Sequence, residues 1–280
     1  MESDISKLLA KKRKSIHAQL KEAITRRRVG KKYIDTVGKK DNENSDDYVR
    51  RIRASAENYQ FVRVDFGGKT HYVAFGVPGP IIREDGKFYL IPANIVGGKW
   101  GTHHILLYPD LETIKNQSEI LVRIDSGCFS GGVLEDITCD CQEQLNISLG
   151  MCVENGSGIL IEIPGQDGRG WGGDYKMANQ RIMDELNLDT VDTARMFYGG
   201  DEFIDQRSYN EAAIILRALG LAPHHVLRLA TNNHLKTKGF TDLGMKVIST
   251  KSVVAKEISK IAKGNLKAKS KKLGHNLKNT

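Results

Sequence analysis

The chain has 280 residues, of which 40% are apolar and 27% charged, a composition typical of a globular protein with one large core or two small ones. No apolar run approaches the roughly 20 residues that a membrane-spanning helix requires, and the first residues lack the apolar centre of a secretory signal, so we expect a cytoplasmic protein without membrane contact. The net charge of +8 lies in the ends, because residues 1–50 hold 14 Lys and Arg against 8 Asp and Glu, and residues 251–280 hold 9 against 1. Such basic flanks are typical of solvated tails, so we do not expect nucleic-acid binding except through these tails.

The first predicted element is a basic helix. Residues 5–28 place apolar side chains at helical spacing among Lys and Arg, which predicts an amphipathic helix. The polar segment over residues 38–47 is typical of a linker. We therefore expect a basic helical extension with its linker over residues 1–48 and a folded domain over residues 49–280.

The folded domain begins with short β-rich runs and continues with strands that alternate with helices. We predict strands at residues 61–66, 71–77, 87–96, 103–111, 119–125, 157–165, 225–233 and 243–250, and helices at residues 175–186 and 209–219. Alternation of strands and helices in the second half favours a mixed α/β fold, in which helices flank a mixed sheet.

Three of the four cysteines follow the strand predicted at residues 119–125. Cys128, Cys139 and Cys141 have the spacing C-x10-C-x-C, which puts two thiols on one tight loop and a third at the end of a strand. Three protein ligands with an open fourth position are typical of a catalytic zinc site. Cys152 is predicted to lie in a separate helical segment. A metal site is the favoured interpretation, and inert buried thiols or a redox role are the alternatives.

A glycine-rich loop over residues 165–173 follows the strand predicted at residues 157–165. Its glycines allow the backbone to approach a ligand closely, and Arg169 offers a planar guanidinium suited to phosphate. A flexible surface loop would explain the same composition.

Two further polar segments stand beside predicted helices or strands. Asp205 and Arg207 precede a helix and could act as a base and a phosphate partner, although a helix cap is an equal alternative. Thr231 and Lys236 follow a strand, where ligands of α/β sheets usually bind, although a polar turn explains them almost as well.

Taken in order, these segments resemble the GTP cyclohydrolase II family, zinc enzymes that open the imidazole ring of GTP at the start of riboflavin synthesis. The matching segments are "RIDSGCFSGGVLEDITCDCQEQL" (residues 123–145), "QDGRG", "LDTVDTA", "DQRSY", "RLATNN" and "NLKAKSKKLGHNL" (residues 265–277). The match covers about residues 100–277. The resemblance implies the fold of that family for the domain over residues 49–280, which would be catalytic.

The resemblance also implies a mechanism and its residues. Cys128, Cys139 and Cys141 would hold one zinc ion, with a water in the fourth position that attacks C8 of the purine. C8 would leave as formate and the β- and γ-phosphates as pyrophosphate, giving 2,5-diamino-6-ribosylaminopyrimidinone 5'-phosphate. Asp205 would accept a proton, and Arg207 would engage the α-phosphate. The base and the triphosphate, with Mg2+, would be held by Arg123, Asp125, Ser126, Gln144, Asp167, Gly168, Arg169, Thr190, Thr231 and Lys236. The resemblance further implies a homodimer.

Several residues around the substrate depart from the family pattern. Asp125 and Gly127 stand where the family has His and Glu, and Gly132 and Thr138 stand where it has Asp and Arg. The segment over residues 176–186 lacks a tyrosine that the family places near the reacting ring. Two alternatives therefore stay open: a relative that hydrolyses another purine or pyrimidine nucleotide, and a non-catalytic zinc domain whose basic tails bind nucleic acid.

Overall fold

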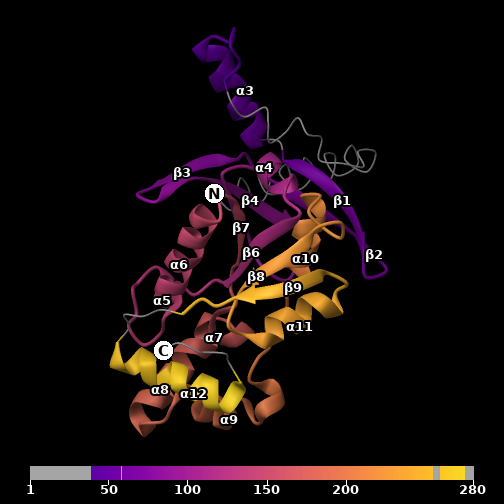
Figure 1. The fold of residues 1–280 in the computed structure, drawn as a ribbon. Helices are drawn as coiled ribbons and strands as arrows, with labels where there is room; N and C mark the ends of the chain where they lie inside the picture. The colour runs from indigo at the N-terminus through magenta and orange to yellow at the C-terminus, as the bar shows by residue number, and fades with distance from the viewer. Residues whose placement is uncertain (1–38, 58, 255–258, 275–280) are drawn as a thin grey trace, which may run out of the picture.

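The computed structural model describes residues 39–57, 59–254 and 259–274, which form a mixed sheet with helices against both faces (Figure 1). The predicted α/β fold class is therefore confirmed. The basic helix predicted over residues 5–28 lies outside the described residues, as do the last residues of the tail motif. No helix in the described part of the chain is long and apolar enough to cross a membrane.

Helix α3 (Ser45–Glu57) extends away from the body of the molecule, and none of its residues is buried (Figure 1). Its first turn is formed by the last three residues of the segment predicted as a linker. Asn44 accepts a hydrogen bond from the backbone of Asp47 at 2.9 Å, which explains why the helix begins inside this polar segment. The predicted domain boundary at residues 48–49 falls within this helix and stays a prediction.

The strands form a sheet in the order β1-β2-β4-β5-β7-β6-β8-β9, with β3 paired to β4 off this path. Their bounds are β1 (Gln60–Phe66), β2 (Lys69–Phe75), β3 (Gly79–Arg83), β4 (Gly86–Ile95), β5 (His103–Tyr108), β6 (Glu119–Ser126), β7 (Gly158–Ile163), β8 (Val226–Ala230) and β9 (Lys246–Lys251). The pairs from β1 to β7 are antiparallel, whereas β6 pairs in parallel with both β7 and β8, and β8 with β9. Each predicted strand is present. β3 escaped prediction because none of its five residues is buried, so it lacks an alternating apolar pattern.

The remaining helices lie on the two faces of the sheet and beyond its edge (Figure 1). They are α4 (Leu111–Lys115), α5 (Phe129–Gly132), α6 (Cys141–Glu154), α7 (Asp167–Gly170), α8 (Gly173–Leu186), α9 (Thr190–Tyr198), the short 3-10 helix η1 (Asp201–Phe203), α10 (Asn210–Ala218), α11 (His234–Asp242) and α12 (Lys260–Leu273). The predicted helices at residues 175–186 and 209–219 correspond to α8 and α10. The placement of Cys152 in a separate helical segment was wrong, because α6 is continuous from Cys141 to Glu154.

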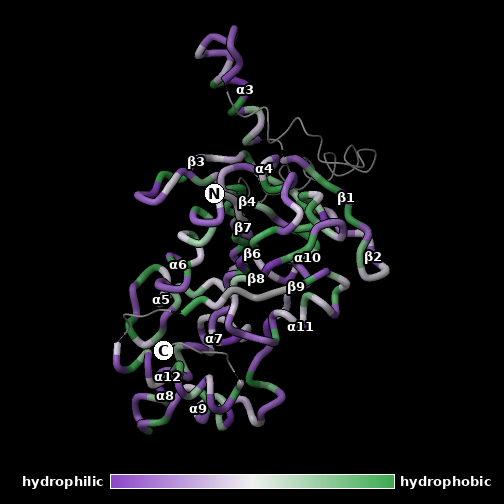
Figure 2. The backbone as a smooth tube through the Cα atoms, in the orientation of Figure 1, coloured by the Kyte–Doolittle hydropathy of each residue, from purple (hydrophilic) through white to green (hydrophobic). Residues whose placement is uncertain are grey.

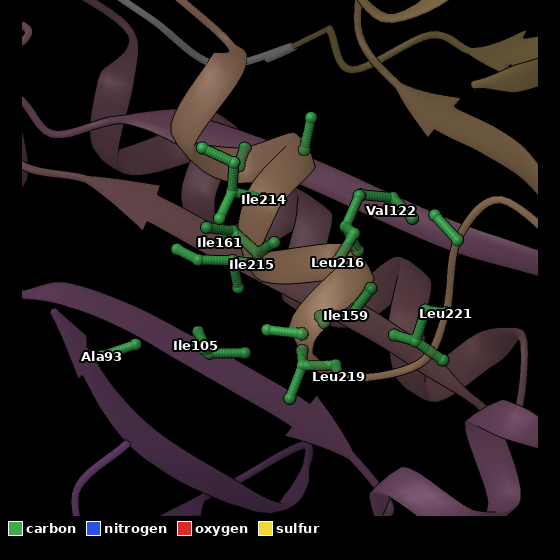
Figure 3. Close-up of a cluster of buried hydrophobic side chains, with 14 of the residues drawn as sticks. Ala93, Ile105, Val122, Ile159, Ile161, Ile214, Ile215, Leu216, Leu219 and Leu221 are labelled. Carbon is green, nitrogen blue, oxygen red and sulfur yellow. The ribbon is translucent and has the colours of Figure 1, made fainter. Parts of the chain in front are cut away.

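The core fills both faces of the central strands. Figure 3 shows Ile215 of α10 beside Ile161 of β7, and Leu216 of α10 beside Val122 of β6 and Ile159 of β7. On the opposite face, Leu121 packs with side chains of α6. Strands buried on both faces need continuous apolar sequence, as "GILIEI" in β7 shows. Figure 2 shows hydrophobic stretches along the central strands and mostly hydrophilic residues along α3.

Because β6 pairs in parallel with β7 and β8, the chain leaves all three strands at the same edge of the sheet. The cysteine segment follows β6, the glycine-rich loop follows β7, and Thr231 follows β8. Ligands of α/β sheets bind beyond the carboxyl ends of the strands. The topology thus places the three candidate segments together.

Replacement of Ile215 by Ala should lower the free energy of unfolding by about 2–5 kcal/mol, because this fully buried side chain would leave a cavity between α10 and the sheet. Urea unfolding followed by circular dichroism measures the change. The matched control is Ile82→Ala in β3, where the side chain is 73% exposed and the expected change is within about 0.5 kcal/mol. Equal losses in the two variants would contradict the assigned core.

Candidate functional site

One pocket at the carboxyl ends of β6, β7 and β8 collects the candidate residues. Asp205 is the one predicted site residue that does not line this pocket, and it is hydrogen-bonded to Arg207, which does. The predicted residues that line the pocket are Arg123, Asp125, Ser126, Cys128, Cys139, Cys141, Gln144, Asp167, Gly168, Arg169, Thr190, Arg207, Thr231 and Lys236. Residues spread over more than 100 positions of the sequence are therefore neighbours in the fold.

The three thiols converge at one end of this pocket. Cys128 lies two residues after the end of β6, and Cys141 is the first residue of α6. Their Sγ atoms and that of Cys139 all lie within 4.8 Å of one another. A Cβ atom at Gly131 would lie 2.2 Å from Sγ of Cys139 and 3.2 Å from Sγ of Cys128, so only glycine at this position lets the thiols approach. The cluster could hold one metal ion.

Lys176 of α8 places a positive charge beside the thiol cluster, because its Nζ donates to Sγ of Cys128 at 2.9 Å. Hydrogen bonds from Cys139, Cys141 and Lys176 lower the pKa of Cys128 well below that of an ordinary thiol. Hydrogen bonding with Cys128 raises the pKa of Cys139 and of Cys141. Cys128 is therefore a thiolate at neutral pH, the form in which cysteine binds metals.

Cys152 has a different role from the other three cysteines. It is 2% exposed and packs in the core between α6 and the sheet. A Cβ atom at Gly158 of β7 would lie 2.5 Å from its Sγ atom, so the thiol fills the space that this glycine leaves. The interpretation as a small buried side chain fits Cys152 alone.

Arg123 forms the floor of the pocket and is 5% exposed. Its Nη2 donates to Oδ1 of Asp125 and to Oε1 of Gln144, both at 3.0 Å. Its Nη1 donates to the carbonyl oxygen of Ala230 at 3.2 Å. The guanidinium thereby joins β6, α6 and the end of β8, and it orients two other candidate residues.

The glycine-rich loop packs closely against residues 205–207. Gly168 and Arg169 have φ values of +58° and +63°, in the left-handed region that non-glycine residues rarely adopt. A Cβ atom at Gly170 would lie 2.6 Å from the carbonyl carbon of Gln206, and the backbone of Gln206 donates to the carbonyl of Arg169 at 2.8 Å. These contacts hold the loop against Gln206 and favour a ligand-binding loop over the alternative of a flexible surface loop.

Arg169 is directed into the pocket and held at its rim. Its Nη2 donates to Oγ1 of Thr190 at 3.2 Å and to the carbonyl of the same residue at 3.3 Å. Burial and the charge of Arg207 lower the pKa of Arg169 to about 10, so the side chain stays charged at neutral pH. At the other side of the loop, Asp167 accepts a hydrogen bond from the backbone of Phe129 at 3.0 Å.

Asp205 and Arg207 form a bidentate ion pair. Nε of Arg207 donates to Oδ1 of Asp205 at 2.8 Å, and Nη2 donates to Oδ2. Burial alone would raise the pKa of Asp205, but the hydrogen bonds and charge of Arg207 outweigh it and lower the pKa below its ordinary value. The carboxylate is therefore ionised at neutral pH and able to accept a proton.

Lys236 lies in the first turn of α11, the helix that follows β8, and is 6% exposed. Its Nζ donates to the carbonyl of Ile124 at 2.7 Å. Burial and the charges of Arg123 and Arg207 lower its pKa well below the ordinary value. Thr231 turns the chain toward α11 by accepting a hydrogen bond from the backbone of Asn233 at 3.1 Å.

Two of the departures from the family pattern differ in their steric surroundings. A Cβ atom at Gly127 would lie 2.2 Å from Oε1 of Glu162, whose other oxygen is 2.6 Å from Nδ1 of His104. No side chain therefore fits at residue 127 while Glu162 keeps this position. By contrast, nothing lies within 4 Å of a Cβ atom at Gly132, so a side chain would fit there.

The sequence prediction missed residues of α8 and α12 that line the pocket. Lys176 and Gln180, four residues apart, share one face of α8. Gln180 donates to Oδ2 of Asp136 at 2.8 Å and to Oγ1 of Thr138 at 3.1 Å. Their spacing is a signal that could have found them. Lys269 of α12 had no comparable signal, because its position depends on long-range packing.

Comparisons with known proteins identify relatives of this chain. The sequence model of the GTP cyclohydrolase II family matches residues 94–252. A RibBA riboflavin biosynthesis protein of Thermotoga maritima is 40% identical over 161 residues, 58% of this chain and 39% of the relative. GTP cyclohydrolase-2 of Archaeoglobus fulgidus is 36% identical over 160 residues, 57% of this chain and 40% of the relative. A chloroplastic monofunctional riboflavin biosynthesis protein RIBA 3 of Arabidopsis thaliana is 33% identical over 175 residues, 62% of this chain and 32% of the relative.

These matches cover about a third to a half of the length of the curated relatives. They include the cysteine segment, the glycine-rich loop, the Asp205–Arg207 pair and the turn after β8. The family model matches more than half of the 280 residues of this chain, so the chain belongs to the GTP cyclohydrolase II family.

Proposed function

We propose that this chain hydrolyses the imidazole ring of GTP and releases formate and pyrophosphate, leaving 2,5-diamino-6-ribosylaminopyrimidinone 5'-phosphate. The observation that supports this function best is the shared pocket, in which a thiol cluster faces arginine and lysine side chains. Thiolates suit a soft metal ion, whereas the cationic side chains suit a phosphate-bearing substrate.

The donor set fits zinc. Sulfur atoms bound to one tetrahedral zinc lie about 3.8 Å apart, which agrees with three Sγ atoms within 4.8 Å and with the space left by Gly131. No further His, Cys, Asp or Glu joins this group among the residues that the structure describes, which favours an open ligand position. A zinc ion held by Cys128, Cys139 and Cys141 would supply Lewis acidity and lower the pKa of a water molecule there.

The other residues would bind the substrate and move protons. Asp205 is ionised and would accept a proton from the attacking water, while Arg207, held by Asp205, would meet the α-phosphate. Arg169 adds positive charge for the triphosphate, together with Mg2+, and Lys236 is a further predicted contact. The further predicted contacts are Arg123, Asp125, Ser126, Gln144, Asp167, Gly168, Thr190 and Thr231.

Buried polar atoms in the pocket support recognition of a heterocycle. Oγ of Ser126, Oε1 of Gln166 and Nδ2 of Asn179 are buried and have no hydrogen-bond partner among the described residues. Buried polar atoms normally have partners, so a ligand or water should complete these bonds. An acceptor and two donors match the mixed edge of a purine or pyrimidine base. A purely structural zinc domain would not need them.

A second candidate is the same ring chemistry on a different nucleotide, or with a different end point. It is favoured by Gln180, which lines the pocket in the segment over residues 176–186, where the family tyrosine is missing, and is hydrogen-bonded to Asp136 and Thr138. Its carboxamide offers no phenol, and the phenol that does line the pocket comes from Tyr198 of α9. The homodimer and the cytoplasmic location stay predictions from the resemblance and the composition.

Incubation of the purified chain with GTP should release formate and pyrophosphate, because the pocket combines a metal site with cationic phosphate contacts. Formate is measured enzymatically and the pyrimidine product by absorbance, with Cys139→Ser as the inactive control. A panel of the other nucleoside triphosphates and of GDP and GMP tests the second candidate. Pyrophosphate release from GTP without formate would favour the different end point, and turnover of another nucleotide alone would reject GTP as the substrate.

Gly131→Ala should abolish stoichiometric zinc binding, since the added methyl group would overlap Sγ of Cys139. Zinc content after dialysis is measured by atomic emission. Gly132→Ala is the matched control, because a Cβ atom there meets nothing within 4 Å, and it should keep one zinc ion per chain. Full zinc content in Gly131→Ala would reject the assigned cluster.

Asp205→Asn should lower kcat by about a hundredfold or more, because the amide cannot accept the proton that the carboxylate would take. Zinc content should stay unchanged, which separates this effect from metal loss. Asp201→Asn is the control in the same segment, since Asp201 is exposed and pairs with Arg195 outside the pocket. A kcat equal to that of Asp201→Asn would remove Asp205 from the mechanism.

A further inference from the structure

The first half of helix α12 is hydrogen-bonded to residues beside the thiol cluster. Oγ of Ser259 donates to the carbonyl of Ile137 at 2.5 Å and also caps the helix. Nδ2 of Asn265 donates to the carbonyl of Thr138 at 2.8 Å. Because Thr138 directly precedes Cys139, these bonds fix the side of α12 that faces the pocket.

The second half of α12 forms ion pairs at the start of α9. Nζ of Lys272 lies 2.6 Å from a carboxylate oxygen of Asp189 and 2.6 Å from one of Asp192. Asp189 is also the N-cap of α9, the helix whose first residue, Thr190, holds Arg169. Both halves of α12 are thus tied to segments that carry site residues (Figure 1).

Lys269 lies between Asn265 and Lys272, which make these contacts, and it lines the pocket. It is four residues after Asn265, so the two side chains share one face of the helix. Its side chain is half-buried, and it has no hydrogen bond or ion pair with any residue in the described part of the chain. Its position gives the pocket a cation that no carboxylate of the described residues neutralises.

The other cations of the pocket are already engaged. Arg123 and Arg207 are paired with carboxylates, Arg169 is hydrogen-bonded to Thr190, Lys176 to Sγ of Cys128, and Lys236 to a buried carbonyl. Their side chains are held in place before any ligand arrives. Lys269 has a flexible stem and a compact ammonium group, which can reach an anion without first breaking an internal bond.

We propose that Lys269 binds the phosphate groups of the substrate, so that α12 supplies a ligand contact as well as a wall of the pocket. The identity of the substrate rests on the proposed function, whereas the contact itself requires only a phosphate-bearing ligand. An ammonium and a phosphate oxygen form a charge-assisted hydrogen bond.

The test is titration of the full-length, zinc-loaded chain with inorganic tripolyphosphate in a calorimeter. Lys269→Met keeps the length of the side chain and removes its charge, and it should weaken tripolyphosphate binding about tenfold. Lys269→Arg keeps the charge and should stay within about twofold of the unsubstituted chain. Lys267→Met and Lys271→Met are matched controls on the same helix, since both side chains are exposed and neither lines the pocket, and their binding should be unchanged.

Binding of guanosine, which carries no phosphate, should be the same in Lys269→Met and the unsubstituted chain. The inference is overturned if Lys269→Met binds tripolyphosphate as tightly as the control variants, if Lys269→Arg fails to keep binding while its melting temperature is unchanged, or if the unsubstituted chain binds no tripolyphosphate. Formate release from GTP is measured separately. Its absence would reject the proposed function, while the tripolyphosphate titration would still decide the role of Lys269.

Discussion

The parallel pairing of β6 with β7 on one side and β8 on the other is the constraint on which the site depends. In the register of these strands, Val122 lies beside Ile159 and Leu229, so β6 and β7 end level with each other and β8 ends three residues earlier. Both faces of these strands are covered by apolar side chains, which leaves no room for chemistry within the sheet. Polar groups are therefore confined to the edge where the three chains leave it.

Arg123 is the polar residue that connects this edge to the core. It is buried at the end of β6, and its three bonds reach Asp125, Gln144 and the carbonyl of Ala230. A buried guanidinium is costly unless its donors are bonded, and only Nε lacks a partner among the described residues, so these bonds stabilise the relative positions of β6, α6 and β8. The residues at the floor of the pocket are thus positioned by the same interactions that allow Arg123 to be buried.

Much of the sheet and of the site was predictable from local patterns. The central strands are apolar and β-branched, and the C-x10-C-x-C spacing and the Asp205–Arg207 pair stand out in the sequence. Features that depend on distant packing were not predictable. α6 shows weak amphipathic character, so its continuity from Cys141 to Cys152 was missed, and the requirement for glycine at residue 131 appears only when three thiols are placed in space. Lys269 faces the pocket because of contacts to residues more than 70 positions away.

The carboxylate of Glu162 lies beside Gly127, so the residues that can occupy positions 127 and 162 depend on each other. A glutamate at residue 127, as the family usually has, would collide with Glu162, which pairs with His104 on the neighbouring strand. A single substitution toward the family residue therefore requires the carboxylate of Glu162 to move away from His104. The residue at position 127 is thus coupled to an ion pair between β5 and β7, although it belongs to neither strand.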